Sequence, residues 1–458
     1  MDEKKTLNEL IENNVNVRSN PTELKITDLR VCNINGAPKH CPLIKIYTNQ
    51  GIVGYGEVRD ASSATYALML KSRLLGENPC NVDKLFRRIK QFGGHSRQGG
   101  GVCGIELALW DIVGKAYGVP LYQLLGGKFR DKVRVYCDTD VHGKHTGTDM
   151  GHALKKRMEQ GFTFLKMDLG IELLLDEPGC LNAPLGFLED IKKYSMKAIN
   201  HQKGSIDMDM MLGKNYETFT IPHHATGIHL TQKGMDYLED YVRQVRDVIG
   251  YEVPLAIDHF GHICIEDCIM FAKRLEKYNI AWIEDIAPWH YTRHFEKISN
   301  AVNVPVCTGE DIYLAENFEP LMANGGVSVV HPDLLTVGGC MEMKKLGNMC
   351  DKYGVAMAIH MAESPIAMMG AIHCAAAVQN ILAVEFHSID IPWWNDLANG
   401  IDNPLFKDGF VKVPEKPGLG IDSLNEELIA EHIHDKYPGQ WEPTDQWNKE
   451  WANDREWS

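Results

Sequence analysis

The sequence predicts an α/β protein in which a closed barrel of parallel strands carries a smaller α+β unit. Short apolar runs alternate with amphipathic stretches over much of the chain, as in a parallel sheet covered by helices. Several runs end in acidic residues at constant spacing, because Asp258, Glu284 and Glu310 follow one another at intervals of 26 residues. The chain has 458 residues, which is more than a single core usually supports.

Residues 1–132 are predicted to form the α+β unit. Residues 24–58 have the pattern of β-strands, and the turn sequence at 49–51 indicates a hairpin. Residues 64–92 are predicted to form helices interrupted by a turn at Gly76 to Pro79. A Gly-rich loop at 93–101 then leads into a helix rich in Ala, Leu and Ile.

Residues 133–395 are predicted to form the barrel, with a break in its rhythm at about 170–230. On the second strand, Lys166 and Asp168 are expected to point to the same side, because strand side chains alternate. An insertion of this size in a βα loop is expected to lie over the active face, where it shapes a pocket or a subunit contact.

Three histidines of this insertion are expected to be surface or oligomer-contact residues rather than ligands: His223, His224 and His229. Residues 396–458 are predicted to return to the first unit and to end in an acidic tail rich in Trp. Because several tryptophans are rarely left in water, the tail is expected to pack on its own chain or on a neighbour.

Composition excludes several classes of partner. A formal net charge of -15 argues against a nucleic-acid or anionic-membrane partner, since either would require a basic face. No apolar run is long enough to span a membrane, and the N-terminus is polar where a secretory signal would be apolar, so a cytoplasmic location is expected. The 12 cysteines form no CxxC pair and are expected to be reduced and buried.

The acidic strand ends predict a metal site. Asp258, Glu284 and Glu310 would offer only oxygen ligands, which suits a hard cation, and Mg²⁺ is the usual choice where the metal also binds substrate. A purely structural cluster of ion pairs is the alternative. Three carboxylates at two equal intervals favour the metal.

The next strand ends predict a base. Asp333 and His360 close consecutive apolar runs, so the carboxylate can hold one imidazole nitrogen and make the other more basic. A buried core histidine is the alternative for His360. Glu385, one strand later, could hydrogen-bond the substrate, and Lys166 would face the pair across the barrel mouth unless it simply pairs with Asp168.

Together these groups predict a site for a carboxylate substrate. A metal would bind the carboxylate and stabilise the enediolate that forms when the α-proton is removed. A base on one side and an acid on the other could then complete the reaction.

The same features resemble those of the mandelate racemase subgroup of the enolase superfamily, over residues 24–430. The resemblance rests on GIELALWDIVGKAYGVPLYQLLGG, FLKMD, the Asp258, Glu284 and Glu310 triad, the Asp333 and His360 pair, Glu385, and PGLGID. It implies a modified TIM barrel, (β/α)7β, with an α+β capping domain and lid loops near 37–41 and 93–101. Members of the family are acid-sugar dehydratases, racemases, epimerases and cycloisomerases.

The sequence departs from its relatives at two places. A racemase of this family carries a second Lys where this chain has Asp168, so a two-base racemase is disfavoured. Galactonate and mannonate dehydratases place a His two residues after the first metal ligand, where this chain has Phe260 flanked by His259 and His262. Asp168, His259 and His262 are therefore predicted to contact substrate.

Lid residues complete the predicted site. His40, His95 and Arg97 suit recognition of a hydroxylated chain. The leading hypothesis is a Mg²⁺-dependent acid-sugar dehydratase in which His360 removes the α-proton and a 3-hydroxyl leaves as water, giving a 2-keto-3-deoxy acid. The alternatives are a cycloisomerase or epimerase using the same enediolate, and a non-catalytic relative. A small sugar acid is the expected partner, and a homo-oligomer the expected assembly.

Overall fold

The parallel strands close into a barrel. The structure is a computed structural model that describes residues 19–183, 199–200, 205–206, 227–258, 261 and 263–449. The barrel strands are β4 (Lys132–Tyr136), β5 (Leu165–Asp168), β10 (Leu255–Asp258), β11 (Ile280–Glu284), β12 (Val306–Thr308), β13 (Val329–Val330), β14 (Ala356–Ile359) and β15 (Ile381–Glu385). Neighbouring strands pair in parallel from β5 through β10 to β15 and then β4. A parallel bridge between Cys137 and Leu165 joins β4 to β5 and closes the ring.

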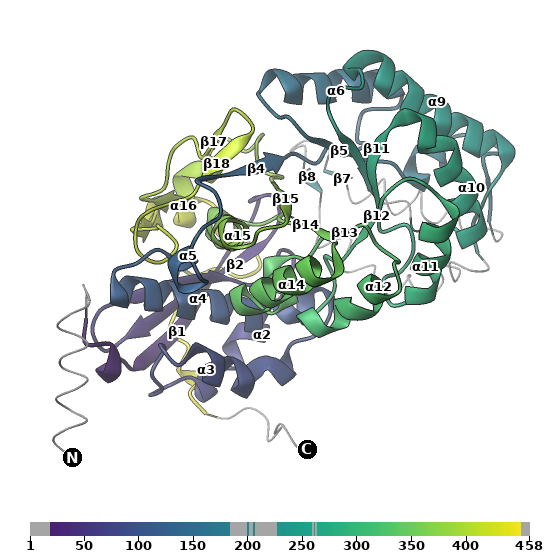
Figure 1. The fold of residues 1–458 in the computed structure, drawn as a ribbon. Coiled ribbons are helices and arrows are strands. Elements are labelled where there is room, and N and C mark those ends of the chain that lie inside the picture. Colours follow the sequence, from purple (N-terminus) through teal and green to yellow (C-terminus); the bar gives the residue numbers. More distant parts are fainter. Residues whose placement is uncertain are drawn as a thin grey trace.

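Helices form the outer layer of the barrel (Figure 1). They are α6 (Gly147–Glu159), α9 (Gln232–Ile249), α10 (Ile265–Leu275), α11 (Thr292–Ala301), α12 (Glu319–Ala323), α14 (Cys340–Tyr353) and α15 (Pro365–Ala377), with the short α13 (Leu334–Val337) ahead of α14. In α9, the buried Leu238, Tyr241, Val242 and Val245 follow the three-and-four spacing of an amphipathic helix. Eight strands with helices between them confirm the predicted (β/α)7β barrel.

The N-terminal unit is an antiparallel sheet covered by helices. Its strands are β1 (Ile26–Ile34), β2 (Cys41–Thr48) and β3 (Val53–Glu57), and its helices are α2 (Thr65–Leu68), α3 (Val82–Ile89), α4 (Gly100–Tyr117) and α5 (Leu121–Leu124). The predicted hairpin joins β2 to β3, with Gly51 at a φ of 78° as the turn requires. Figure 1 shows this sheet and its helices beside the barrel, as the predicted α+β cap.

Helix α4 lies unusually close to strand β3. A Cβ atom on Gly56 would stand 2.0 Å from the carbonyl oxygen of Gly104, and one on Gly104 would stand 2.2 Å from that of Glu57. Only glycine permits this approach, so the two glycines set the distance between the helix and the sheet.

Substitution of Gly56 by Ala is expected to destabilise the protein. The added methyl group would meet backbone atoms, which cannot move aside as a flexible side chain can, so we expect a loss of about 1–3 kcal/mol in the free energy of unfolding. Urea denaturation measures this loss. An unchanged midpoint would show that the helix can shift without cost.

The C-terminal segment joins the two units. Strands β17 (Phe406–Lys407) and β18 (Phe410–Lys412) pair antiparallel beside β4, and β16 (Ala398–Asn399) pairs with β19 (Ser423–Leu424). After α16 (Glu426–Glu431), Ile433 bridges to Ile34 of β1. Trp441 is buried, and its Nε1 donates to Glu426 at 2.7 Å. No helix among the described residues is long and apolar enough to cross a membrane.

The insertion separates β5 from α9. Its described parts include β6 (Leu181–Asn182), which pairs antiparallel with β9 (His229–Leu230), and the short pair β7 (Ile199–Asn200) and β8 (Ser205–Ile206). Two of the predicted surface histidines, His223 and His224, lie outside the described residues.

Candidate active site

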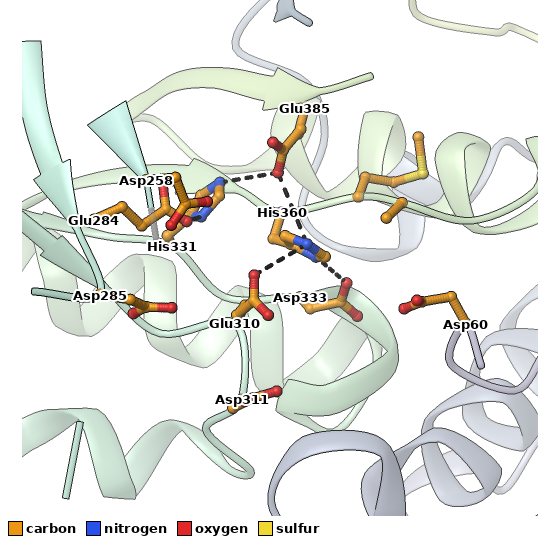
Figure 2. A network of polar contacts seen from close by, with 12 residues as sticks. Asp60, Asp258, Glu284, Asp285, Glu310, Asp311, His331, Asp333, His360 and Glu385 are labelled. Carbon is orange, nitrogen blue, oxygen red and sulfur yellow. Dashed lines mark hydrogen bonds and ion pairs between the residues drawn. The ribbon is translucent and has the colours of Figure 1, made fainter. Parts of the chain in front are cut away.

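Six of the predicted site residues meet at the mouth of the barrel, at the C-terminal ends of its strands (Figure 2). Asp258, Glu284 and Glu385 are the last residues of β10, β11 and β15, and Glu310 comes two residues after β12. Asp333 comes three residues after β13 and caps the N-terminus of α13, and His360 directly follows β14. All six side chains are largely buried, so their charges interact through a medium that screens them poorly.

Asp333 and His360 form a hydrogen-bonded pair. The Nδ1 of His360 lies 2.6 Å from Oδ2 of Asp333, and the other oxygen of that carboxylate accepts the backbone N–H of Leu335 at 2.6 Å. Because the ionised carboxylate only accepts hydrogen bonds, Nδ1 carries the proton that it donates. The Nε2 atom of His360 therefore faces the mouth, 3.1 Å from Glu310, as a base requires.

The surrounding carboxylates control the protonation of His360. Burial alone would lower the pKa of His360, but the charges of Glu310 and Glu385 and the hydrogen bond to Asp333 raise that pKa to about 10. While these charges are uncompensated, the imidazole holds its proton at neutral pH. Any cation that neutralises Glu310 therefore lowers the pKa of His360 and frees the imidazole to act as a base.

Carboxylates crowd the opposite side of the mouth. Oxygen atoms of Asp258, Glu284 and Asp285 lie within 4.8 Å of one another. Burial, together with the charges of Glu310, Asp258 and Glu284, raises the pKa of Asp285 well above its usual range. Glu310 lies between this group and the Asp333–His360 pair (Figure 2). Buried acids at this density are unfavourable unless a positive charge neutralises them.

Lys166 supplies a positive charge within this group. Its Nζ lies 2.7 Å from Asp258, 2.9 Å from Glu385 and 3.3 Å from Glu284. Burial lowers the pKa of Lys166, but the three carboxylates raise it well above its usual range. The alternative of a Lys held only by Asp168 is wrong, because Lys166 reaches the ends of three other strands.

The donor set fits a hard divalent cation. The carboxylates are oxygen donors only, they lie on adjacent strands, and one ammonium group cannot balance all of their charges. Asp258, Glu284 and Glu310 could hold the cation, and Asp285 is a further oxygen donor that the sequence reasoning missed. Its position directly after Glu284 was the available signal.

Two positively charged side chains of the predicted lid loops contact one carboxylate beside the Asp333–His360 pair. Asp60 is fully buried, and Lys39 approaches it at 3.0 Å and Arg97 at 3.2 Å. Figure 2 shows Asp60 on the far side of Asp333 from Glu310. Arg97 was predicted from the sequence, whereas Lys39 and Asp60 were missed.

Two other predicted lid residues have different surroundings. The His40 ring hydrogen-bonds Asn33 at 2.9 Å and stacks on Tyr437, and these two neighbours belong to the cap and the C-terminal segment. His95 accepts the backbone N–H of Tyr313 at 3.1 Å, and its ring lies 4.4 Å from that of Trp289. Asp168 pairs in register with Asp258 at the strand ends. His259 and His262 lie outside the described residues.

Arg59 is a further residue that the sequence reasoning missed. Its guanidinium is fully buried, with Nε 3.0 Å from Asp60, 3.5 Å from Glu363 and 3.6 Å from Asp333. It also donates to the carbonyl oxygen of Glu310 at 2.8 Å. The cap therefore places a fixed positive charge next to Asp333 of the Asp333–His360 pair.

Replacement of Arg59 by Leu is expected to destabilise the protein by about 3–5 kcal/mol, because buried carboxylates lose their cation. Urea denaturation measures this loss. Arg87→Leu is the control, since the ion pair of Arg87 with Asp83 is exposed and its loss should cost no more than about 1 kcal/mol. Equal stability of the two variants would contradict this account of Arg59.

His331 holds the Glu284 carboxylate by a hydrogen bond. Its Nδ1 lies 2.5 Å from Glu284, and its Nε2 lies 2.6 Å from the hydroxyl of Tyr136. Since Nδ1 donates to the carboxylate, Nε2 accepts from the tyrosine. Strand periodicity could have revealed His331, because it lies two residues before Asp333. By the same spacing, His387 follows Glu385 and lies 3.2 Å from it.

Comparison with known proteins identifies the family. Residues 149–427 match the family model described as enolase C-terminal domain-like, which covers more than half of the chain. Residues 16–126 match the model described as mandelate racemase / muconate lactonizing enzyme, N-terminal domain. The chain belongs to the mandelate racemase subgroup of the enolase superfamily. The predicted resemblance is thereby confirmed.

Its similarities within this superfamily extend over nearly the whole chain. The D-xylonate dehydratase of Haloferax volcanii is 28% identical over 425 residues, which cover 91% of each protein. The D-galactonate dehydratase of Pectobacterium atrosepticum is 26% identical, covering 89% of this chain and 94% of that protein. A mandelate racemase/muconate lactonizing enzyme-like protein from Rubrobacter xylanophilus matches with a TM-score of 0.73 and 26% identity, over 90% of this chain and 98% of that structure.

Proposed function

We propose that the protein is a sugar-acid dehydratase, a hydro-lyase that removes water from a carboxylate substrate. The observation that carries this proposal is the pairing of His360 with Asp333 at 2.6 Å, opposite a buried group of carboxylates in the same barrel mouth. The similarity to proteins named D-xylonate and D-galactonate dehydratase supports water loss over the other fates of the same intermediate.

Mg²⁺ is the proposed cofactor, held by Asp258, Glu284 and Glu310. When bound, it would supply positive charge where negative charge develops on the substrate carboxylate as the α-proton leaves. Lys166 contacts two of these carboxylates and is placed to bind the substrate carboxylate from the other side. Glu385 and His387 border the same space and could position a hydroxyl group.

The chemistry follows from the direction in which His360 points. Its Nε2 takes the proton from the carbon next to the carboxylate, and the electrons of that C–H bond pass into the carboxylate as an enediolate. The enediolate then forms a carbon–carbon double bond as the hydroxyl on the next carbon leaves. The leaving hydroxyl takes up a proton and departs as water. The resulting enol becomes a 2-keto-3-deoxy acid. Asp333 keeps the imidazole in the tautomer and orientation that this requires.

Substrate recognition is assigned to the residues around this space. Arg97 and Lys39 of the predicted lid loops both form ion pairs with Asp60, which lies beside the mouth. Asp168 lies at the end of the strand next to the one that ends in Asp258. A homo-oligomer remains part of the proposal, since a long insertion in a βα loop is suited to a subunit contact.

A panel of sugar acids tests the proposed function. Purified protein with Mg²⁺ is incubated with aldonic, aldaric, uronic and anhydro-sugar acids, D-xylonate and D-galactonate among them. The molecular masses of the products are measured by mass spectrometry. We expect at least one acid to lose the mass of one water, and the loss to stop when the metal is chelated. A product of unchanged mass would identify a cycloisomerase or epimerase instead. Turnover of none of the acids would support a non-catalytic relative.

A further inference from the structure

A second group of metal-ligating side chains lies outside the barrel mouth, at the start of α10. His229 on β9, Cys264 at the N-cap of α10 and Asp267 in its first turn bring one ligand atom each to within 4.8 Å of one another. The Sγ of Cys264 lies 3.1 Å from Nδ1 of His229, and the same Nδ1 lies 3.2 Å from Oδ2 of Asp267. None of the three takes part in the reaction proposed above.

We propose that His229, Cys264 and Asp267 bind a divalent transition metal of the Zn²⁺ type. Tetrahedral zinc bonds of about 2.0–2.3 Å would place neighbouring ligand atoms roughly 3.3–3.6 Å apart. The two measured separations lie close to this range, so the ligands need only small movements. A water molecule would complete the four-coordinate shell.

The Nδ1 atom of His229 cannot serve both of its neighbours through hydrogen bonds at once. If Nδ1 of His229 carries a proton, it can donate to Asp267, but the thiol of Cys264 then loses that nitrogen as an acceptor. If Nδ1 is unprotonated, it accepts from the thiol but turns its lone pair toward the carboxylate. A metal ion removes this conflict because it uses a lone pair of all three ligands at once.

The backbone holds the ligands in place before any metal binds. The N–H of Cys264 donates to the carbonyl oxygen of Ile228 at 3.0 Å, and the N–H of Leu230 donates to Asp267 at 2.9 Å. These bonds tie β9 to the first turn of α10. Cys264 and Asp267 are buried, whereas the His229 side chain is 49% exposed and leaves a path from solvent. A site fixed in this way loses little entropy on binding.

Charge and ligand type separate this site from the barrel mouth. A thiolate, a carboxylate and a neutral imidazole would balance the two charges of the metal, and the N-terminal end of α10 favours the two anionic ligands. Thiolate and imidazole select zinc-like metals, whereas the three carboxylates proposed as ligands at the mouth select harder cations. A metal here would fasten the end of the insertion to the helix that follows β10, the strand ending in Asp258.

Cobalt titration tests the site, because Co²⁺ bound to a thiolate absorbs by charge transfer. Full-length protein is kept in excess Mg²⁺ and titrated with Co²⁺. We expect a thiolate charge-transfer band that saturates near one equivalent. The band should vanish in Cys264→Ser, and Co²⁺ should bind at least about tenfold more weakly to His229→Asn. Cys80→Ser is the matched control, since Cys80 is the more exposed cysteine and should leave the band unchanged.

The Glu284→Gln variant separates this site from the proposed active-site metal. It should keep the cobalt band whether or not the mouth still binds metal. His229 is half-exposed, so its replacement tests the site even if Cys264→Ser folds poorly. Absence of the band in the wild-type protein, or its persistence in both site variants, would overturn the proposal.

Discussion

Replacement of His360 by Asn is expected to lower turnover of the reactive sugar acid by about 10²–10⁴-fold, because the proposed reaction loses its base. Asn is close in size and can still hydrogen-bond Asp333, so the mouth should keep its shape. Mg²⁺ affinity should change far less than turnover, since His360 is not among the proposed ligands. Steady-state kinetics and calorimetric Mg²⁺ titration measure the two quantities separately.

His373 provides the matched control for this substitution. It is a fully buried histidine of α15 whose Nδ1 accepts the N–H of Tyr122 at 3.2 Å, and burial lowers its pKa to about 4. His373→Asn should therefore retain most of the activity. If His360→Asn stayed within a few-fold of the wild-type turnover, another group would have to be the base.

Replacement of Glu284 by Gln is expected to remove both Mg²⁺ binding and activity. Glu284 sits among Lys166, His331 and Trp282, whose nitrogen atoms lie within 3.3 Å of its oxygens. A neutral amide would bind the cation weakly, and its NH₂ group would oppose donors that now point at a carboxylate. We expect turnover to fall by at least about 10³-fold, since the charge stabilisation supplied by the metal would be lost.

The control for Glu284 is Glu106, a buried glutamate of α4. It accepts the N–H groups of Cys340 and Met341, and burial raises its pKa to about 7, so it is partly neutral already. Glu106→Gln should keep Mg²⁺ binding and turnover. Mg²⁺ titration of both variants provides the comparison, and full Mg²⁺ affinity in Glu284→Gln would contradict its assignment as a ligand.

Periodicity made the barrel predictable. Apolar runs ending in Asp258, Glu284 and Glu385 coincide with the ends of β10, β11 and β15. Because parallel strands bring these ends to one edge, the sequence also indicated which side chains would meet. The pairing of Asp333 with His360 follows from the same rule, since their strands are neighbours.

Contacts between distant parts of the chain were not predictable in this way. Arg59 and Asp60 come from the cap, and no local pattern shows that Arg59 reaches Asp333. Within the predicted lid at residues 37–41, Lys39 rather than the adjacent His40 pairs with Asp60. Adjacent residues point their side chains in different directions, and the sequence of a loop does not show which of them faces the site.

Loss of the α-hydrogen tests the central claim most directly. A reactive sugar acid carrying deuterium on the carbon next to its carboxylate is incubated with wild-type protein and Mg²⁺ in ordinary water, and the position of the label is followed by NMR. The account predicts that deuterium leaves that carbon as product forms and that the labelled acid reacts more slowly than the unlabelled one. It also predicts that His360→Asn releases the label at least about 10²-fold more slowly than the wild-type protein. Formation of product in which that carbon keeps its deuterium would contradict the proposed role of the barrel mouth.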